Sequence, residues 1–224
     1  MSGVQVAVRT RPTGTFAEDN LKIGADRQTI HVWPAAGAPH EHTREARQWK
    51  YDQVLHNVSQ QTLFDELVAP VVDSVLAGYN GTVLCYGQTG AGKTYTHIGS
   101  TSSFAQRGIA PRAIARIFKH IDSHPHNEAV VTASYLEIHN DNLIDLLAHL
   151  PNEAQSSEPL TMIEDRNGAL SVKGLRSLVV ANEEAALAAL FEGERSRSVS
   201  RHELNDHSSR CLLYTSPSPR DGLL

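Results

Sequence analysis

Eight consecutive residues, 87–94, have the types and the spacing that nucleotide chemistry requires. They read GQTGAGKT and match the pattern G-x-x-x-x-G-K-[ST], in which backbone N–H groups of a glycine-rich loop surround a phosphate. The side chain of Lys93 would contact the β- and γ-phosphates as a point charge, and the Thr94 hydroxyl would ligate Mg²⁺. The motif therefore predicts a site for a nucleoside triphosphate and Mg²⁺, formed by Gly87, Gln88, Thr89, Gly90, Ala91, Gly92, Lys93 and Thr94.

The neighbouring residues decide between this interpretation and a flexible surface turn, which could also explain a glycine-rich stretch. Residues 82–86 (TVLCY) form a short, nearly continuous apolar run, the pattern of a buried parallel strand. Residues 95–98 (YTHI) are compatible with a helix. Because a strand before the loop and a helix after it are the context that this motif requires, we favour the phosphate-binding interpretation.

The rest of the chain alternates strand-like and helix-like segments. Apolar alternation and β-rich composition predict strands within 4–12, 29–33 and 129–138, and a hairpin of 161–163 with 170–172. Apolar spacing and capping residues predict helices at 59–67, from 70 to about 78, at 111–122 and at 183–195. This order predicts an α/β fold of the P-loop NTPase type, with a mixed, largely parallel central sheet and helices on both faces.

Composition and charge argue against several other classes of protein. The chain has 224 residues, a net charge of −5 and a pI of about 6.2, so no global positive field would draw it onto nucleic acid. Two cysteines, Cys85 and Cys211, are too few for a disulfide framework. We find neither an apolar signal segment at the start nor a run near the roughly 18 residues of a membrane span. These features predict a cytoplasmic protein with no membrane span.

Two further clusters could carry chemistry, but each has a simpler explanation. His120, His124 and His126 lie where a predicted helix runs into a loop, without a cysteine or carboxylate at ligand spacing, so we interpret them as solvated. A basic cluster follows the helix predicted from 183, and its cations suit a solvated helix end; its members are Arg195, Arg197 and Arg201.

The wording around the loop is narrower than that of a general nucleotide-binding motif and resembles the kinesin motor domain. Further phrases typical of kinesins follow the order of that family along the chain. The phrases are 9–12 (RTRP), 78–82 (GYNGT), 86–90 (YGQTG), 135–140 (YLEIHN) and 205–210 (NDHSSR). Residues 190–194 (LFEGE) and Cys85 resemble the kinesin-9 group, which is associated with cilia and flagella.

The resemblance implies roles for residues outside the loop. Arg9, Arg11 and Pro12 would lie near the adenine, and Tyr95 would stack on it. Ser208 and Ser209 would belong to switch I, where one serine contacts a water on Mg²⁺, here assigned to Ser209, and both act in catalysis together with Lys93. Without the resemblance, these would be ordinary strand-end, helix and coil residues.

The chain departs from the kinesin pattern after residue 210. Kinesins continue with Ser-His after the switch I arginine, but here Cys211 and Leu212 follow, and the second switch segment, D-L-A-G-S-E, is absent. We therefore expect a partial motor domain at 1–210, with its C-terminal part missing, and a disordered tail at 211–224 that does not belong to the family.

The resemblance implies ATP hydrolysis coupled to movement along microtubules, on the cytoskeleton and in the cilium or flagellum. Because the second switch is missing, a truncated motor that binds nucleotide without turning it over is the alternative. Another P-loop NTPase is a less favoured one, since the N-K-x-D segment of GTPases is absent.

Overall fold

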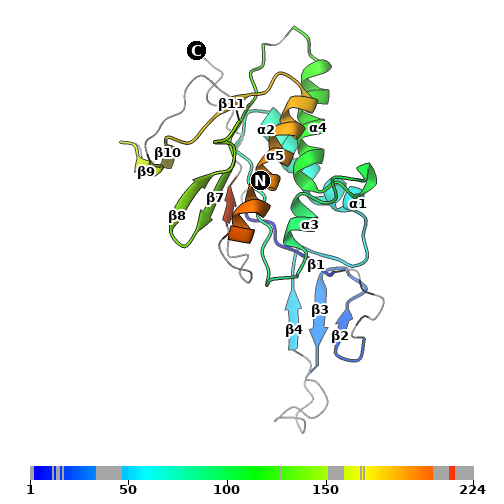
Figure 1. Cartoon of the computed structure of the whole chain (residues 1–224). Helices are drawn as coiled ribbons and strands as arrows, with labels where there is room; N and C mark the ends of the chain where they lie inside the picture. The colour runs from blue at the N-terminus through cyan, green and yellow to red at the C-terminus, as the bar shows by residue number, and fades with distance from the viewer. Residues whose placement is uncertain are drawn as a thin grey trace. The chain divides into compact units, whose positions relative to one another are not determined.

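The structure is a computed structural model that describes residues 3–11, 13, 16, 18–33, 47–126, 128–150, 159–166, 168, 170–203 and 212–214. The chain forms two compact units, Met1–Leu63 and Phe64–Leu224. Both contain helices and strands, which agrees with the α/β class expected from the sequence (Figure 1).

The first unit contains short strands and one helical turn. Its elements are β1 (Ala7–Arg9), β2 (Leu21–Ile23), β3 (Thr29–Val32), β4 (Arg47–Lys50), β5 (Gln53–Leu55) and α1 (Gln60–Leu63). Strands β1 and β5 pair in parallel, whereas β2, β3 and β4 form an antiparallel sheet. The apolar core is made by the buried side chains of Ile30, Val54, Leu55 and Leu63. The predicted strand at 29–33 is confirmed, and that within 4–12 is confirmed for three residues.

A helical run carries the chain out of the first unit, much as its capping residues predict. The Ser59 hydroxyl accepts a hydrogen bond from the Thr62 N–H at 3.0 Å and so caps α1. The run continues as a π-helical stretch, η1 (Phe64–Val68), and as α2 (Ala69–Leu76), with Pro70 in its first turn. It ends at Leu76, and Gly78, two residues later, has a φ of 96°, the left-handed conformation that closes many helices.

The second unit is built around helices that pack on one another. They are α2, α3 (Lys93–His97), the 3₁₀ turn η2 (Phe104–Gln106), α4 (Ile109–Asp122) and α5 (Glu183–Glu203). Helix α4 packs against both α2 and α5, as Figure 1 shows. One apolar cluster of this unit is formed by Ile98, Tyr135, Leu146, Leu147 and Leu190, and a second by Phe118, Val180 and Ala186.

The strands of the second unit are β6 (Thr132–Ala133), β7 (Leu136–His139), β8 (Asn142–Asp145), β9 (Thr161–Glu164), β10 (Leu170–Lys173), β11 (Leu178–Val179) and β12 (Leu212–Tyr214). They pair antiparallel, β9 with β10, β6 with β11, and β7 with both β8 and β12. The predicted hairpin of 161–163 with 170–172 is thereby confirmed. Among the described strands, β1 and β5 are the only pair that runs parallel.

Two predictions about strands are wrong. Residues 82–86 form no ladder with any described strand, and Leu84 and Tyr86 are 72% and 93% exposed. An apolar run becomes a buried strand only where neighbouring strands pair with its edges and other elements cover its faces. Among the described residues, no strand pairs with 82–86. Conversely, Leu212–Tyr214 lie in the tail expected to be disordered, yet this apolar triplet pairs with β7. The other residues of the tail lie outside the described ones.

Helix α5 begins where expected but extends eight residues further than the predicted end at Arg195. The Asn182 side chain accepts a hydrogen bond from the Ala185 N–H at 2.8 Å and caps its start. Arg197 is not part of a solvated helix end, because it is only 8% exposed and pairs with Glu194. No described helix is both long and apolar enough to cross a membrane.

Candidate functional site

The loop at 87–94 adopts a conformation that depends on its glycines. The φ angles of Gly87, Gly90 and Gly92 are 150°, 80° and 94°, and L side chains rarely adopt such positive values. A Cβ atom added at Gly90 or Gly92 would have no neighbouring atom within 4 Å. These two glycines are therefore needed for backbone conformation, with open space beside them, and not for packing against the protein.

Lys93 and Thr94 begin α3 directly after the loop. The Lys93 ammonium donates hydrogen bonds to the carbonyl oxygens of Gly87, at 2.7 Å, and Gln88, at 2.8 Å. The loop is closed further by the Ala91 N–H, which donates to the Gln88 carbonyl at 3.1 Å. The Lys93 ammonium is thus held against the loop carbonyls, and the space beside Gly90 and Gly92 is open.

This arrangement fits a polyphosphate group and its cation. The Lys93 ammonium supplies a charge for phosphate oxygens, and the exposed Thr94 supplies a hydroxyl, the kind of ligand that Mg²⁺ prefers. Tyr95, the next residue of α3, is 40% exposed. The identity of the bound group stays a prediction from the motif.

The residues predicted to lie near an adenine belong to the first unit. There the Arg9 guanidinium donates to the Gln60 amide oxygen at 2.9 Å and to the Val58 carbonyl at 3.4 Å, so it is held at the start of α1. Arg11 is exposed, and Pro12 lies outside the described residues. Their role at a nucleotide stays a prediction.

The predicted switch I residues, Ser208 and Ser209, lie outside the described residues, as does the rest of 204–211. The described helix that precedes them is α5, which ends at Glu203. Their contribution to Mg²⁺ binding and catalysis therefore also stays a prediction.

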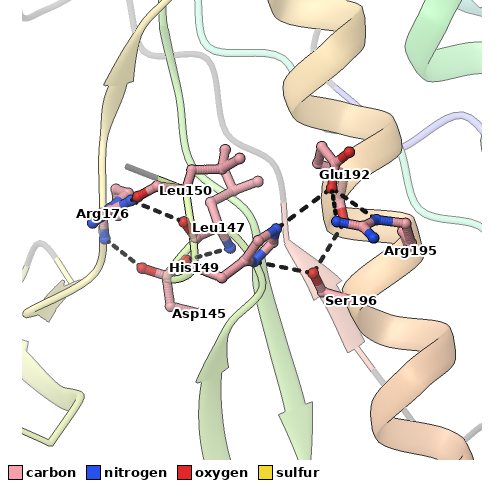
Figure 2. A network of polar contacts seen from close by, with 8 residues as sticks. All are labelled: Asp145, Leu147, His149, Leu150, Arg176, Glu192, Arg195 and Ser196. Carbon is pink, nitrogen blue, oxygen red and sulfur yellow. Dashed lines mark hydrogen bonds and ion pairs between the residues drawn. The ribbon is translucent and has the colours of Figure 1, made fainter. Parts of the chain in front are cut away.

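Sequence patterns did not identify the polar contacts that fix α5 in this unit. Figure 2 shows the contacts of α5 with His149, whose ring lies 3.5 Å from a Glu192 carboxylate oxygen and 3.2 Å from the Ser196 hydroxyl. Glu192 also pairs with Arg195 at 2.8 Å, and the Arg195 guanidinium is the largest cause of a lowered Glu192 pKa. The spacing of Glu192 and Arg195, three residues apart on a helix, is the signal that could have revealed this pair.

The turn that carries His149 is itself fixed by a polar network. The Asp145 carboxylate accepts hydrogen bonds at 2.9 Å from the backbone N–H groups of Leu147 and Arg176. The Arg176 guanidinium in turn donates to the carbonyl oxygens of Leu147 and Leu150 (Figure 2). The turn after β8 is therefore a defined platform for α5, and His149 contacts the helix from it.

Comparison with known families supports the resemblance noted in the sequence. The kinesin motor domain profile matches residues 9–213. Kinesin-like protein KIF9 of Mus musculus is 41% identical over 210 residues, covering 92% of this chain and 26% of that protein. Kinesin-like protein KLP1 of Chlamydomonas reinhardtii is 43% identical over 210 residues, with the same coverage of both chains.

A solved structure agrees with these matches in fold. It is described as "Structure of a fast kinesin: Implications for ATPase mechanism and interactions with microtubules" and superposes with a TM-score of 0.75 at 30% identity. The match covers 93% of this chain and 57% of that one. The chain spans about a quarter of the length of the two relatives above, 26% in each case. From its matched motor-domain residues, its identity to these relatives and its fold, the chain belongs to the kinesin motor domain family.

Proposed function

We propose that this chain binds ATP and Mg²⁺ at residues 87–94 and forms the nucleotide-binding part of a microtubule motor. The observation that carries the proposal is the loop itself: three glycines at positive φ are followed by Lys93, whose ammonium contacts the loop carbonyls. Its occurrence in a chain of the kinesin motor domain family points to ATP as the nucleotide.

Each residue of the loop has a distinct task in this proposal. The glycines would keep the backbone N–H groups close to the phosphates, and Lys93 would neutralise β- and γ-phosphate charge. Thr94 would hold Mg²⁺, with Ser209 contacting it through water. When bound, Mg²⁺ neutralises charge on the phosphate oxygens. Tyr95, Arg9, Arg11 and Pro12 are proposed to contact the adenine, and Ser208 and Ser209 to act in hydrolysis.

Binding is tested by thermal unfolding of the chain with and without Mg·ATP. Ligand at 100 times its dissociation constant stabilises a protein by about 2.7 kcal/mol, or a midpoint rise of roughly 5–10 °C for a chain of this size. Lys93→Ala should abolish the rise, whereas Lys119→Ala should keep it, because Lys119 is an exposed residue of α4. No rise for the native chain, or an equal rise for Lys93→Ala, would contradict the proposal.

The alternatives are separated by turnover and by the base. Phosphate release that microtubules stimulate would support the motor function, whereas binding without turnover would support an inactive truncated motor. Preferential stabilisation by GTP would favour a different P-loop NTPase.

Association with microtubules and the cytoskeleton is proposed from the family, and the cilium or flagellum from the resemblance to the kinesin-9 group. Co-sedimentation with microtubules tests the first. Imaging of the tagged chain in ciliated cells tests the second, and exclusion from the cilium would contradict it.

A further inference from the structure

Helix α3 is short, so its position depends on what holds its two ends. It has five residues and carries Lys93 and Thr94 in its first turn. The segment that leads into the loop, 82–86, joins no ladder with a described strand. The exit of α3 must therefore contribute much of what fixes the Lys93 ammonium in this unit.

The exit is anchored by backbone contacts to the start of α4. The Gly108 N–H donates to the Ile98 carbonyl at 2.8 Å. A Cβ atom on Gly108 would lie 2.6 Å from the backbone of His97, so the two segments touch directly. Ile98 is buried in the apolar cluster that includes Tyr135 and Leu190. The last turn of α3 is thus in close contact with the core.

Beside this exit lies a cluster of charged and polar side chains from α5, from α3 and from Tyr135, the residue before β7. From α5, the Glu194 carboxylate accepts hydrogen bonds from the Tyr135 hydroxyl and, at 2.6 Å, from the Arg197 guanidinium. The side chains of Glu194 and Arg197 are only 16% and 10% exposed. From α3, His97 has a buried Nδ1 with no hydrogen-bond partner among the described residues.

His97 responds electrostatically to the two α5 residues. Burial is the largest effect and lowers the His97 pKa, while the Glu194 charge raises it and the Arg197 charge lowers it. The carboxylate therefore attracts any positive charge on the ring, and the guanidinium opposes it. The contacts that join Glu194 to the end of α3 are its hydrogen bond from the Tyr135 hydroxyl and the buried apolar cluster that Tyr135 shares with Ile98.

We propose that Glu194 is a positioning residue for the nucleotide site, holding the end of α3 through Tyr135 and Ile98 so that Lys93 keeps its place at the loop. It contacts no predicted ligand itself. The inference rests on the proposed function, since Lys93 is taken to bind phosphate. Glu194 would act over little more than one helical turn, because Lys93 and Ile98, the cap of α3, are five residues apart.

Glu192 provides a matched control on the same helix. Both glutamates accept a hydrogen bond from an arginine three residues later, Glu192 from Arg195 and Glu194 from Arg197. Glu192 faces His149 at the turn after β8 (Figure 2), whereas Glu194 accepts a hydrogen bond from the Tyr135 hydroxyl. A general weakening of α5 would make the two glutamine variants behave alike, and a positioning role would make them differ.

The test compares Glu194→Gln and Glu192→Gln by ATP affinity and by hydrogen exchange. We expect Glu194→Gln to weaken binding about fivefold or more, as loss of a charged partner in a buried cluster implies, and Glu192→Gln to change it less than twofold. Without nucleotide, the Thr96 and Ile98 amides, which donate to carbonyls within the loop and α3, should exchange about tenfold faster in Glu194→Gln alone. Tyr135→Phe, a milder change, should show the same pattern more weakly.

A double-mutant cycle shows whether Glu194 acts through Tyr135. In a Tyr135→Phe background, Glu194→Gln should change ATP affinity and exchange less than twofold. Equal effects in both backgrounds, or equal exchange in the Glu194 and Glu192 variants, would overturn the inference. If the native chain binds no ATP, the proposed function fails, and the exchange measurement still decides whether Glu194 holds α3.

Discussion

Replacing Gly193 with alanine sets two effects of known sign against each other. Gly193 lies inside α5, where alanine should stabilise a helix by about 1 kcal/mol. However, a Cβ at this position would lie 2.0 Å from Cδ1 and 2.6 Å from Cε1 of the Tyr135 ring. The ring would have to withdraw by roughly 1.4 Å to reach 3.4 Å, the shortest ordinary van der Waals separation.

Tyr135 has little freedom to withdraw. It is 2% exposed, packs in the apolar cluster with Leu146 and Leu190, and its hydroxyl is bonded to Glu194. Overpacking of a closely packed core costs about 1–3 kcal/mol, and this overlap places Gly193→Ala at the upper end. We expect a net destabilisation of about 2 kcal/mol, or a midpoint lowered by roughly 4–8 °C.

Thermal and denaturant unfolding of Gly193→Ala measure this effect, with Ala188→Gly as the control. Ala188 is an exposed residue of α5, so that variant reports the propensity term alone and should lose about 1 kcal/mol. Tyr135→Leu removes the ring edge that the new Cβ would meet. In a Tyr135→Leu background, Gly193→Ala should therefore lower the free energy of unfolding by less than it does in the native chain. A stabilised Gly193→Ala variant would refute the reasoning that packing outweighs propensity here.

Three further predictions concern pH, a surface ion pair and self-association. Burial lowers the His97 pKa below 6.5, so the unfolded chain binds a proton before the folded chain does as the pH falls. The free energy of unfolding should therefore decrease by up to about 1.4 kcal/mol per pH unit below pH 6.5 and become constant below the lowered pKa. His97→Gln should remove this pH dependence in unfolding titrations. Asp73→Asn should cost less than about 1 kcal/mol by denaturant unfolding, because the Asp73–Arg116 pair is about half exposed. Leu84→Glu should reduce concentration-dependent light scattering, because Leu84 and Tyr86 expose apolar surface that favours association; unchanged scattering would contradict this.

The sequence predicted features that depend on neighbouring residues along the chain. The Ser59 and Asn182 caps, the helix at 111–122 and the hairpin of β9 and β10 all follow from short patterns, and each is present. The loop at 87–94 is of the same kind, because its glycines set its φ angles locally. Local patterns are reliable where local hydrogen bonds decide the structure.

One local signal was missed although it was present. Asn140 and Asp141 both have positive φ, 49° and 62°, and join β7 to β8 in a two-residue turn. Asparagine and aspartate tolerate these angles, so the dipeptide is a hairpin signal. The apolar content of residues 129–138 drew the prediction to a single strand, and β8 was overlooked.

Predictions failed where the outcome depended on residues distant in the sequence. The burial of α5 near its predicted end depends on a distant residue, because Glu194 binds the hydroxyl of Tyr135, 59 positions earlier, and Arg197 is buried with it. Residues 82–86 have the composition of a buried strand, but composition cannot supply the strands on either side. Glu194 could not be identified at all, because an acidic residue on a predicted helix is usually a solvated one.

The wrong strand prediction at 82–86 and the overlooked residue Glu194 concern the two sides of the phosphate-binding loop. Together they explain why α5 contributes to the position of the loop. In a strand-loop-helix unit, a ladder would fix the loop from its strand side and packing would fix it from its helix side. Here Leu84 and Tyr86 are exposed on the strand side, while Ile98, Gly108 and the Glu194 cluster hold the helix side. A change at Glu194 should therefore affect the loop more than an equal change in residues 82–86, so Leu84→Glu should leave ATP affinity within about twofold of the native chain, whereas Glu194→Gln should not.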